Sequence, residues 1–251
     1  MTVSEEDTPV IVGAEKIEES KYGLLGLPDT GLVGTIAVGH TIRSKDFKEV
    51  AHVSPSALPP ILVIHDGEPK SPVRIFSGKE VFALISETPM PYATYVDLAE
   101  SLVRLAKEKR VELLISITGI AVENRVEIIQ PSVFGIGSTN VVRDMLKSRG
   151  FQLLEEGFIA GPQALVLNEC IKQHVPIAVL LAQSHPNFPD PAAASVILTR
   201  LNEAFGFNID VRSLQEQAEE FRIRLRELMQ KTQQSMRSMK SQEQELPALY
   251  G

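Results

Sequence analysis

The stretch GLPDTGLVGTIAVGHTIRS, residues 26–44, decides how this chain begins to fold. It follows the apolar run YGLLGL at 22–27 and continues as a helical pattern, so a strand must become a helix within a few residues. We expect Asp29 or Thr30 to cap that helix, because short polar side chains satisfy the free amides of a first turn. The glycines that would let the helix lie close to the sheet are Gly31, Gly34 and Gly39.

Short β-rich runs recur along the chain, and several are apolar without alternation, which is typical of central strands covered on both faces. They lie at 9–14, 49–54, 61–66, 73–78, 80–87, 112–119, 126–130 and 177–183. Helical patterns separate them, at 95–110, 140–150, 161–174 and 190–206. Asp190 with Pro191 marks one helix start, and Gly150 marks one helix end. The alternation predicts an α/β fold with a mainly parallel sheet flanked by helices, plus one antiparallel hairpin that turns at SGKE, 77–80.

A third pattern begins after the last of these helices. Residues 211–239 contain no glycine or proline, are rich in charge, and carry apolar residues at coiled-coil spacings of 4, 3, 4 and 3. These residues are Leu214, Ala218, Phe221, Leu225 and Leu228. A stripe this narrow favours pairing between helices of several chains, as dimers through tetramers, over a helix that lies on its own domain. We therefore expect an α/β domain at 1–208, a helical oligomerisation segment at 209–240 and a flexible tail at 241–251.

Composition restricts the classes of partner. The 251 residues carry a formal net charge of -7, which disfavours nucleic acid as a partner because phosphate binding needs a concentrated positive surface. The acidic N-terminus lacks the basic and then apolar order of a signal peptide, and the longest apolar runs are far shorter than the ~20 residues of a membrane helix. Cys170 is the single cysteine, so no internal disulfide forms. We expect a soluble, cytoplasmic protein.

The glycine-rich turn resembles three chemical motifs, and each comparison fails. Gly26 and Gly31 have the spacing of a phosphate-binding P-loop, but Leu32 and Val33 stand where its lysine and hydroxyl residue belong. A dinucleotide fingerprint would need a glycine where Asp29 stands, and its carboxylate would repel a pyrophosphate. The DTG triplet of aspartic proteases belongs to all-β enzymes, whereas this one opens a helix. The turn is better explained as a structural element than as a catalytic one.

Other candidate chemistry is equally weak. Ser138 has no candidate general base at a spacing typical of a catalytic pair. Cys170 lies inside a helical pattern, where we expect it to be a buried small hydrophobic residue. The histidines lack metal-site spacing, and HDGEP, with His65, Asp66 and Glu68, has the composition of a loop. We therefore expect no catalytic residue, no cofactor and no metal.

Several ordered turns together resemble one family. The segments are LLGLPDTGLVGTIAVGHTI at 24–42, ISITGIAVE at 115–123, AGPQALVLNEC at 160–170 and HPNFPDPAAASVILTRLNEAF at 185–205. They resemble, in order, segments of the proteasome assembly chaperone family, over about residues 8–206. Asp29 and Thr30 stand where that family usually has a glycine, a mild departure. The resemblance implies an α/β fold similar to nucleoside phosphorylases and hydrolases, in a chaperone and not an enzyme.

The resemblance also suggests a role for the last residues, LYG. Leu249, Tyr250 and Gly251 match the hydrophobic-Tyr-any ending with which proteasomal ATPases and some assembly factors dock between α-subunits of the core particle. We expect an ATP-independent, homo-oligomeric factor whose tails bind those pockets. The alternative is an enzyme on the phosphorylase- or hydrolase-like scaffold that holds a small anionic ligand with the turns at 26–34 and 134–138.

Overall fold

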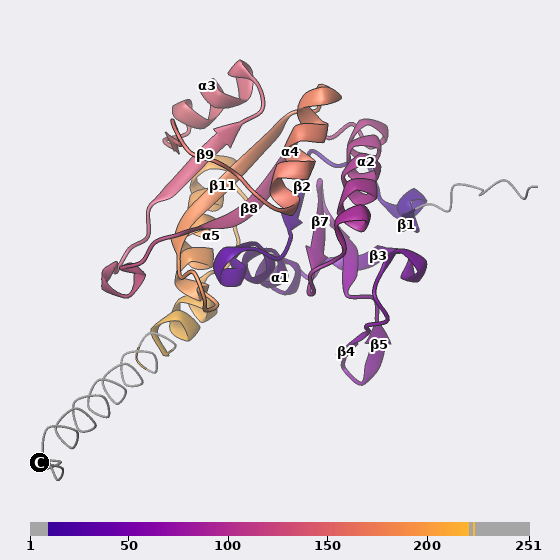
Figure 1. The fold of residues 1–251 in the computed structure, drawn as a ribbon, viewed down its shortest axis with the longest axis horizontal. Helices are drawn as coiled ribbons and strands as arrows, with labels where there is room; N and C mark the ends of the chain where they lie inside the picture. Colours follow the sequence, from indigo (N-terminus) through magenta and orange to yellow (C-terminus); the bar gives the residue numbers. More distant parts are fainter. Residues whose placement is uncertain (1–9, 221–222, 224–251) are drawn as a thin grey trace, which may run out of the picture.

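A nine-stranded sheet forms the centre of the protein (Figure 1). The computed structural model describes residues 10–220 and 223. In spatial order the strands are β1 (Ile11–Val12), β3 (Lys48–Val53), β6 (Val73–Gly78), β7 (Val81–Ser86), β2 (Tyr22–Gly26), β8 (Leu113–Ala121), β11 (Ile177–Ser184), β9 (Val133–Gly137) and β10 (Gln152–Leu153). A separate hairpin, β4 (Val63–His65) and β5 (Glu68–Lys70), projects from one side.

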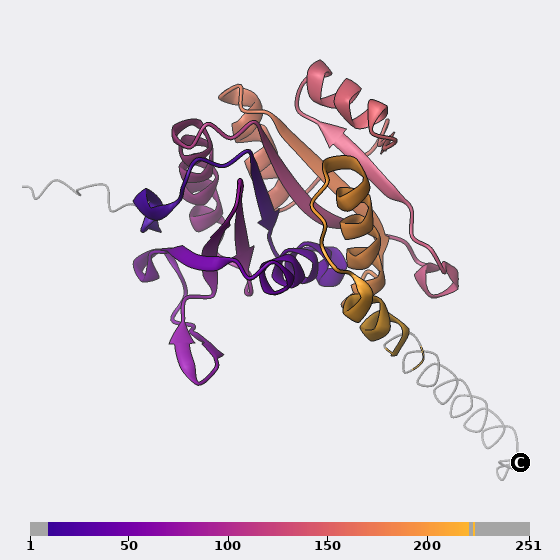
Figure 2. The ribbon, with the colours of Figure 1, turned by 180° about the vertical axis from the view of Figure 1, so that it is seen from behind.

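Helices cover both faces of this sheet. They are α1 (Val33–Ser44), α2 (Tyr92–Glu108), α3 (Asn140–Ser148), α4 (Pro162–Lys172) and α5 (Pro191–Phe205). Helices α2 and α4 pack on one face, and the view from behind shows α1 and α5 on the other (Figure 2). Leu24 of β2 is buried beneath α1 and α5, while its neighbour Leu25 is buried beneath α2 and α4. Burial on both faces explains why the central strands are apolar without alternation.

The sheet is mixed, so the expectation of a mainly parallel sheet was only partly right. Strands β7, β2, β8 and β11 run parallel, as do β9 and β10, but β1, β3, β6 and β7 pair antiparallel, as do β11 and β9. The expected hairpin at 77–80 is confirmed as the turn between β6 and β7. A parallel neighbour needs a long crossover, usually a helix. The β6–β7 link is far too short for one. The link from β8 to β9, which lies beyond β11 in the sheet, holds only the 3-10 turn η4 (Arg125–Glu127), and β9 runs opposite to β8 and β11.

One strand was placed wrongly. The apolar run at 126–130 forms η4 and irregular chain, and the strand is β9 at Val133–Gly137, a segment interpreted above as a ligand-binding turn. Its glycines weaken the sequence signal for a strand. They are there for packing: a Cβ on Gly137 would lie 2.7 Å from the amide nitrogen of Arg143 in α3. Close approach of α3 thus requires a glycine in a position that otherwise favours a β-branched residue.

The start of the C-terminal helix also differs from expectation. Residues 212–220 are helical, but Leu214, expected in a seam between chains, is only 2% exposed and packs in the core of its own domain. Ala218 is half-buried beside α5. The short connection from α5 brings this first turn back onto the domain, where Leu214 buries its side chain against its own chain. Phe221, Leu225 and Leu228 lie outside the described residues.

Candidate functional site

The glycine-rich turn lies at the carboxyl ends of the central parallel strands. The turn follows β2. After it, the chain continues to β3, on the side of β2 where β6 and β7 also lie, whereas β8 lies on the opposite side of β2. The order of strands thus changes direction between β2 and β8, the place where open α/β sheets bind their ligands. The 3-10 turn η2 (Thr30–Leu32) connects β2 to α1 at this point.

Asp29 fastens this turn to the sheet. Its Oδ2 accepts hydrogen bonds from the amide nitrogens of Gly119 in β8, at 2.8 Å, and Gly34 in α1, at 3.2 Å. Burial raises the pKa of the Asp29 carboxyl to about 7, although hydrogen bonds from Gly34, Thr118 and Gly119 oppose the rise. Asp29 therefore satisfies an amide in the first turn of α1, as expected from the sequence, and also joins that turn to β8.

Gly31 makes the sharp turn possible. Its φ of 67° lies in the left-handed region, and a Cβ there would lie 1.8 Å from the Oγ of Ser184 at the end of β11. Its carbonyl accepts the amide of Asp190 across 2.8 Å. The turn after β2 is thus fixed against both β8 and the segment that follows β11.

A buried ion pair supports the same edge of the sheet. Arg125 and Asp190 are almost fully buried, with Nε and Oδ2 2.7 Å apart and Nη2 and Oδ1 3.0 Å apart. Arg125 also donates to the carbonyls of Gln183 and Ile128, and Asp190 accepts the amides of His185 and Ala193. The expected cap of α5 by Asp190 is confirmed, whereas sequence reasoning missed Arg125, which lies 65 residues away along the chain.

A cavity of ≈ 550 Å³ opens beside Asp29. It lies between the β2–α1 turn, the carboxyl end of β8 and residues 154–163, which lead from β10 into α4. Its lining residues are mixed in character, with Asp29 and Thr118 beside apolar residues such as Leu181. This is the size of site that accommodates a small organic ligand.

The anionic-ligand site of the alternative hypothesis does not form. Gly31 lies next to Ser184 at the carboxyl end of β11, whereas Gly137 pairs with Ala178 near the other end of that strand. At ~3.3 Å per residue, about 20 Å along β11 separates the position beside Gly31 from the position beside Gly137. Ser138 accepts the amide of Ile177 through its Oγ, a structural contact at that far end. Residues 133–137 thus form a strand, and their glycine Gly137 lies far from Gly31 instead of facing it across a ligand site.

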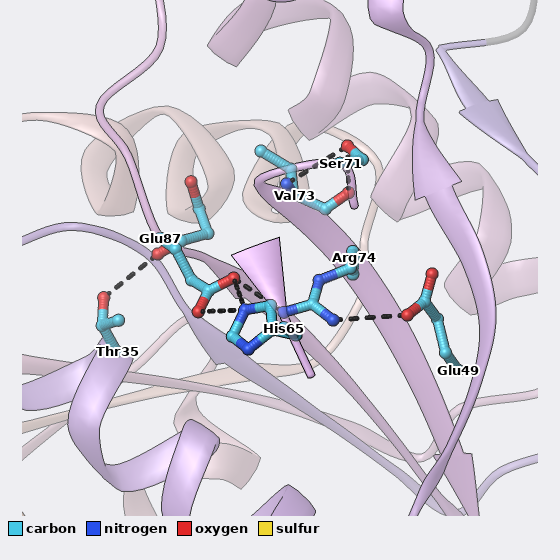
Figure 3. Close-up of polar contacts among 8 residues, drawn as sticks. Thr35, Glu49, His65, Ser71, Val73, Arg74 and Glu87 are labelled. Carbon is cyan, nitrogen blue, oxygen red and sulfur yellow. Dashed lines mark hydrogen bonds and ion pairs between the residues drawn. The ribbon is translucent and has the colours of Figure 1, made fainter. Parts of the chain in front are cut away.

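A second polar cluster surrounds Arg74 at the base of the projecting hairpin (Figure 3). The buried guanidinium donates to Glu87 at 2.7 Å and to Glu49 at 3.3 Å, and His65 lies 3.1 Å from both carboxylate oxygens of Glu87. Glu68, from the same HDGEP loop as His65, pairs instead with Lys70, which lowers the pKa of Glu68. The hydrogen bond between His65 and Glu87 thus ties β4 to the sheet.

Residues 10–220 contain neither a cluster of metal-binding side chains nor a membrane-spanning helix. No group of three or more His, Cys, Asp or Glu side chains that could hold a metal ion occurs in this part of the chain. Nor is any helix of this range long and apolar enough to cross a membrane. Cys170, expected to be buried, is confirmed as such, and burial raises the pKa of its thiol to about 12.

Comparison with known proteins identifies the family. The sequence profile of the PAC2 family matches residues 23–229, which include the β2–α1 turn, the Asp29 contacts and helices α1 to α5. The chain belongs to the PAC2 family. The resemblance to proteasome assembly chaperones inferred from the ordered turns is thereby confirmed, since solved structures similar to this PAC2 protein carry that description.

One similar structure is that of Pyrococcus furiosus PbaA, described as an archaeal homologue of proteasome-assembly chaperone. It is 26% identical, with a TM-score of 0.78, and the match covers 92% of this chain and 96% of PbaA. Pyrococcus furiosus PbaB, described as an archaeal proteasome activator, shares the fold at 22% identity and a TM-score of 0.74, over 87% of this chain and 98% of PbaB. The uncharacterized protein MJ0106 of Methanocaldococcus jannaschii is 27% identical over 242 residues, 96% of this chain and 98% of that protein.

The residues expected to bind partners are not brought together in the described part of this PAC2 protein. Leu249, Tyr250 and Gly251 lie outside it, and of the expected seam only Leu214 and Ala218 are described. The site that the structure does assemble is the Asp29 turn with its cavity. Its signal in the sequence was the GLPDTG turn itself, but the partners of Asp29 in β8 depend on a pairing of distant strands.

Proposed function

We propose that this PAC2 protein is a non-enzymatic, ATP-independent assembly chaperone or binding factor of the proteasome core particle, acting in the cytoplasm. The observation that carries the proposal is its likeness to PbaA, described as an archaeal homologue of proteasome-assembly chaperone, over 92% of the chain at a TM-score of 0.78. A match of that extent includes the whole α/β domain, not only one motif.

The contacts of Asp29 support independence from ATP. Phosphate-binding turns offer free backbone amides at a helix start. Here the amides of Gly34 and Gly119 already donate to the Asp29 carboxylate, and Leu32 occupies the place of the phosphate-binding lysine. A triphosphate would have to displace a carboxylate from its own hydrogen bonds and then lie beside it.

For the contact with the core particle, we propose the last three residues, on the strength of the sequence. The terminal carboxylate of Gly251 would pair with a lysine of an α-subunit pocket, Tyr250 would bury its ring with its hydroxyl hydrogen-bonded, and Leu249 would fill an apolar recess. A single tail binds weakly, because ordering a flexible segment costs entropy. Residues 239–248 would serve as a tether of at most ~35 Å when extended.

Several tails acting together would compensate for that weakness. We propose that residues 209–240 join chains into a homo-oligomer, with Ala218, Phe221, Leu225 and Leu228 as the contact. Tails held at high effective concentration can gain on the order of 10²–10⁴ in affinity. Because Leu214 is buried in its own domain, the proposed seam begins after it.

Binding to purified core particle from the organism that supplies this chain tests the proposal. Full-length protein, a variant lacking 249–251, and Tyr250→Ala are compared by native gel. Tyr92→Ala is the matched control, because Tyr92 is a well-exposed tyrosine of the α/β domain. We expect binding by the full-length protein and the control, and at least a tenfold loss for both tail variants. Equal binding by all four would place the contact on the α/β domain, and no binding by any would refute a proteasome partner.

A second readout separates chaperone from activator. In a mixture of α- and β-subunits, an assembly chaperone accelerates the formation of complete core particle. With preformed core particle, an activator increases peptide hydrolysis. We expect the first effect, without added ATP and with the same dependence on Tyr250. Stimulation of hydrolysis alone would assign the protein as an activator.

A further inference from the structure

One buried residue that lines the cavity beside Asp29 carries a hydrogen-bond donor without a partner. Gln163 is only 3% exposed, and its side-chain Nε2 has no hydrogen-bond partner among the described residues. A buried donor of this kind has given up its bond to water and gained none in return. Such atoms are rare in native proteins, and one that belongs to the lining of a cavity points to a ligand that supplies the missing acceptor.

The same residue contributes a second donor at the start of α4. Pro162 has no N–H, and the amides of Ala164 and Leu165 both donate to the carbonyl of Gly161. Gly161, the N-cap residue, has no side chain to accept a hydrogen bond, and within residues 10–220 the amide of Gln163 makes none. Two donors of one buried residue thus lie at the positive end of a helix of 11 residues.

The carboxyl of Asp29 is not available to a ligand in the same way. It already receives hydrogen bonds from the amides of Gly34 and Gly119, and Thr118 and Val33 donate to it as well. The buried polar groups left over in the lining are therefore the donors of Gln163. What the site lacks is an acceptor.

The charge of the lining decides which kind of acceptor fits. Asp29 and Glu156 are acidic, and no lysine, arginine or histidine is found among the lining residues that the structure describes. A carboxylate or a phosphate would be attracted by the start of α4 but would meet no cation to neutralise it. A neutral oxygen, such as that of a carbonyl group, uses the donors of Gln163 without this repulsion.

Much of the remaining lining is apolar. Leu154, Ile159 and Leu181 are aliphatic, and Phe158, which is 92% exposed, is aromatic. A volume of ≈ 550 Å³ with mostly apolar walls and a few polar groups is typical of small-molecule sites. The ligand therefore needs an apolar part beside its acceptor.

We propose that this cavity binds a small neutral carbonyl compound, whose oxygen accepts hydrogen bonds from Gln163 and whose apolar part contacts Leu154, Ile159 and Phe158. The Nε2 atom is covered in the described chain, but the last torsion of a glutamine side chain is broad, so a turn of the carboxamide brings the donor to the cavity at little cost. The site does not depend on binding to the proteasome. It and the proposed function can therefore fail separately.

Three aromatic probes of similar size distinguish the classes of ligand. Acetophenone carries a neutral acceptor, benzoate carries an anionic acceptor, and benzylammonium carries only donors. In isothermal titration calorimetry of the full-length protein near pH 8, where carboxylates are ionised, we expect saturable binding of acetophenone, about fivefold or more tighter than that of either ion. In NMR spectra of the unaltered protein, the side-chain amide signals of Gln163 should shift on addition of acetophenone.

Substitution of Gln163 assigns the binding to its donor. Gln163→Met keeps the approximate size of the side chain and removes the donor, so acetophenone should bind about fivefold to tenfold more weakly. The fold should be no less stable, because an apolar group of similar shape replaces a buried donor without a partner. Gln130→Met is the matched control: Gln130 is exposed and lines a different cavity, so this variant should bind acetophenone as the unaltered protein does.

Each result either supports the proposal or overturns it. Should Gln163→Met fail to fold, the NMR shift tests the same contact in the unaltered protein. The proposal is overturned if benzylammonium or benzoate binds more tightly than acetophenone, or if acetophenone does not bind at about 10 mM. It is also overturned if folded Gln163→Met binds acetophenone unchanged, or if the amide signals of Gln163 do not respond to bound acetophenone.

Discussion

The carboxylate of Asp29 accepts the amide proton of Gly119 across 2.8 Å, although 90 residues separate them along the chain. This contact joins the turn after β2 to the neighbouring strand β8, and the same oxygen also receives the amide of Gly34 in α1. One side chain therefore connects the turn after β2 to the first turn of α1 and to strand β8.

The buried carboxyl of Asp29 predicts a pH dependence of stability. Its pKa in the folded protein is about 7, above the 3.8 of an unperturbed aspartate, so between about pH 4 and pH 7 the folded state holds a proton that the unfolded state releases. The contribution of Asp29 to stability is therefore most favourable below about pH 4 and is lost as the pH rises through 7. Relative to Asp29→Asn, we expect the free energy of unfolding of the native protein to decrease across this window, by up to about 1.4 kcal/mol per pH unit. Urea titrations of both proteins at several pH values measure the difference; a constant difference would contradict a raised pKa.

Substitution of Gly31 tests the sharp turn. Gly31→Ala should destabilise the protein by more than the ~1–2 kcal/mol of a left-handed backbone, because its Cβ would meet Ser184 at 1.8 Å. Gly67→Ala is the control: Gly67 also has a positive φ, but no atom lies within 4 Å of the added Cβ. Chemical denaturation of the two variants should therefore show the larger loss at Gly31. Equal losses would mean that the contact with Ser184 adjusts without cost.

The buried ion pair at the edge of the sheet predicts a strong effect at Arg125. Arg125→Gln leaves Asp190 buried without its partner and should cost about 3–5 kcal/mol. Arg110→Gln is the comparison, because Arg110 pairs with Glu19 in solvent and such pairs contribute at most about 1 kcal/mol. Denaturation midpoints and slopes for both variants provide the test. A small effect at Arg125 would indicate that water replaces the guanidinium.

The C-terminal helix predicts two separable effects. Leu214→Ala should cost about 2–5 kcal/mol of domain stability, because that side chain is buried in its own core. Leu225→Ala should leave domain stability unchanged and weaken self-association. Thermal unfolding together with sedimentation velocity distinguishes the two outcomes. If Leu214→Ala dissociated an oligomer without lowering domain stability, the packing of Leu214 on its own chain would be wrong for the assembled state.

Sequence patterns correctly predicted the features that depend on interactions between residues close together in the chain. The capping of α5 by Asp190, the glycine after α3 and the hairpin at 77–80 depend on neighbours within a few residues, and each is confirmed. A cap for α1 was expected at Asp29 or Thr30; Leu32 holds the N-cap position instead, while Asp29 accepts the amide of Gly34 in the first turn.

Contacts between segments far apart in the chain could not be predicted from such local patterns. Nothing near Arg125 in the sequence indicates that Asp190 will neutralise it, and nothing near Asp29 indicates Gly119. Strand β9 was missed for a related reason: Gly137 is placed there by the approach of α3, not by any preference for strand. The contacts of these residues depend on how distant strands and helices pair, and not on their immediate neighbours in the sequence.

The position of β2 has a consequence for synthesis of the chain. Tyr22–Gly26 emerges early, but its two neighbours in the sheet are β7 and β8, which end at Ser86 and Ala121. At about 5–20 residues per second, the ribosome needs roughly 5 to 20 s to extend from the end of β2 to the end of β8. Throughout that interval the central strand of the sheet has at least one edge unpaired. A chain that we propose assists the assembly of other proteins thus pairs the central strand of its own sheet on both sides only when about half of its 251 residues have been made.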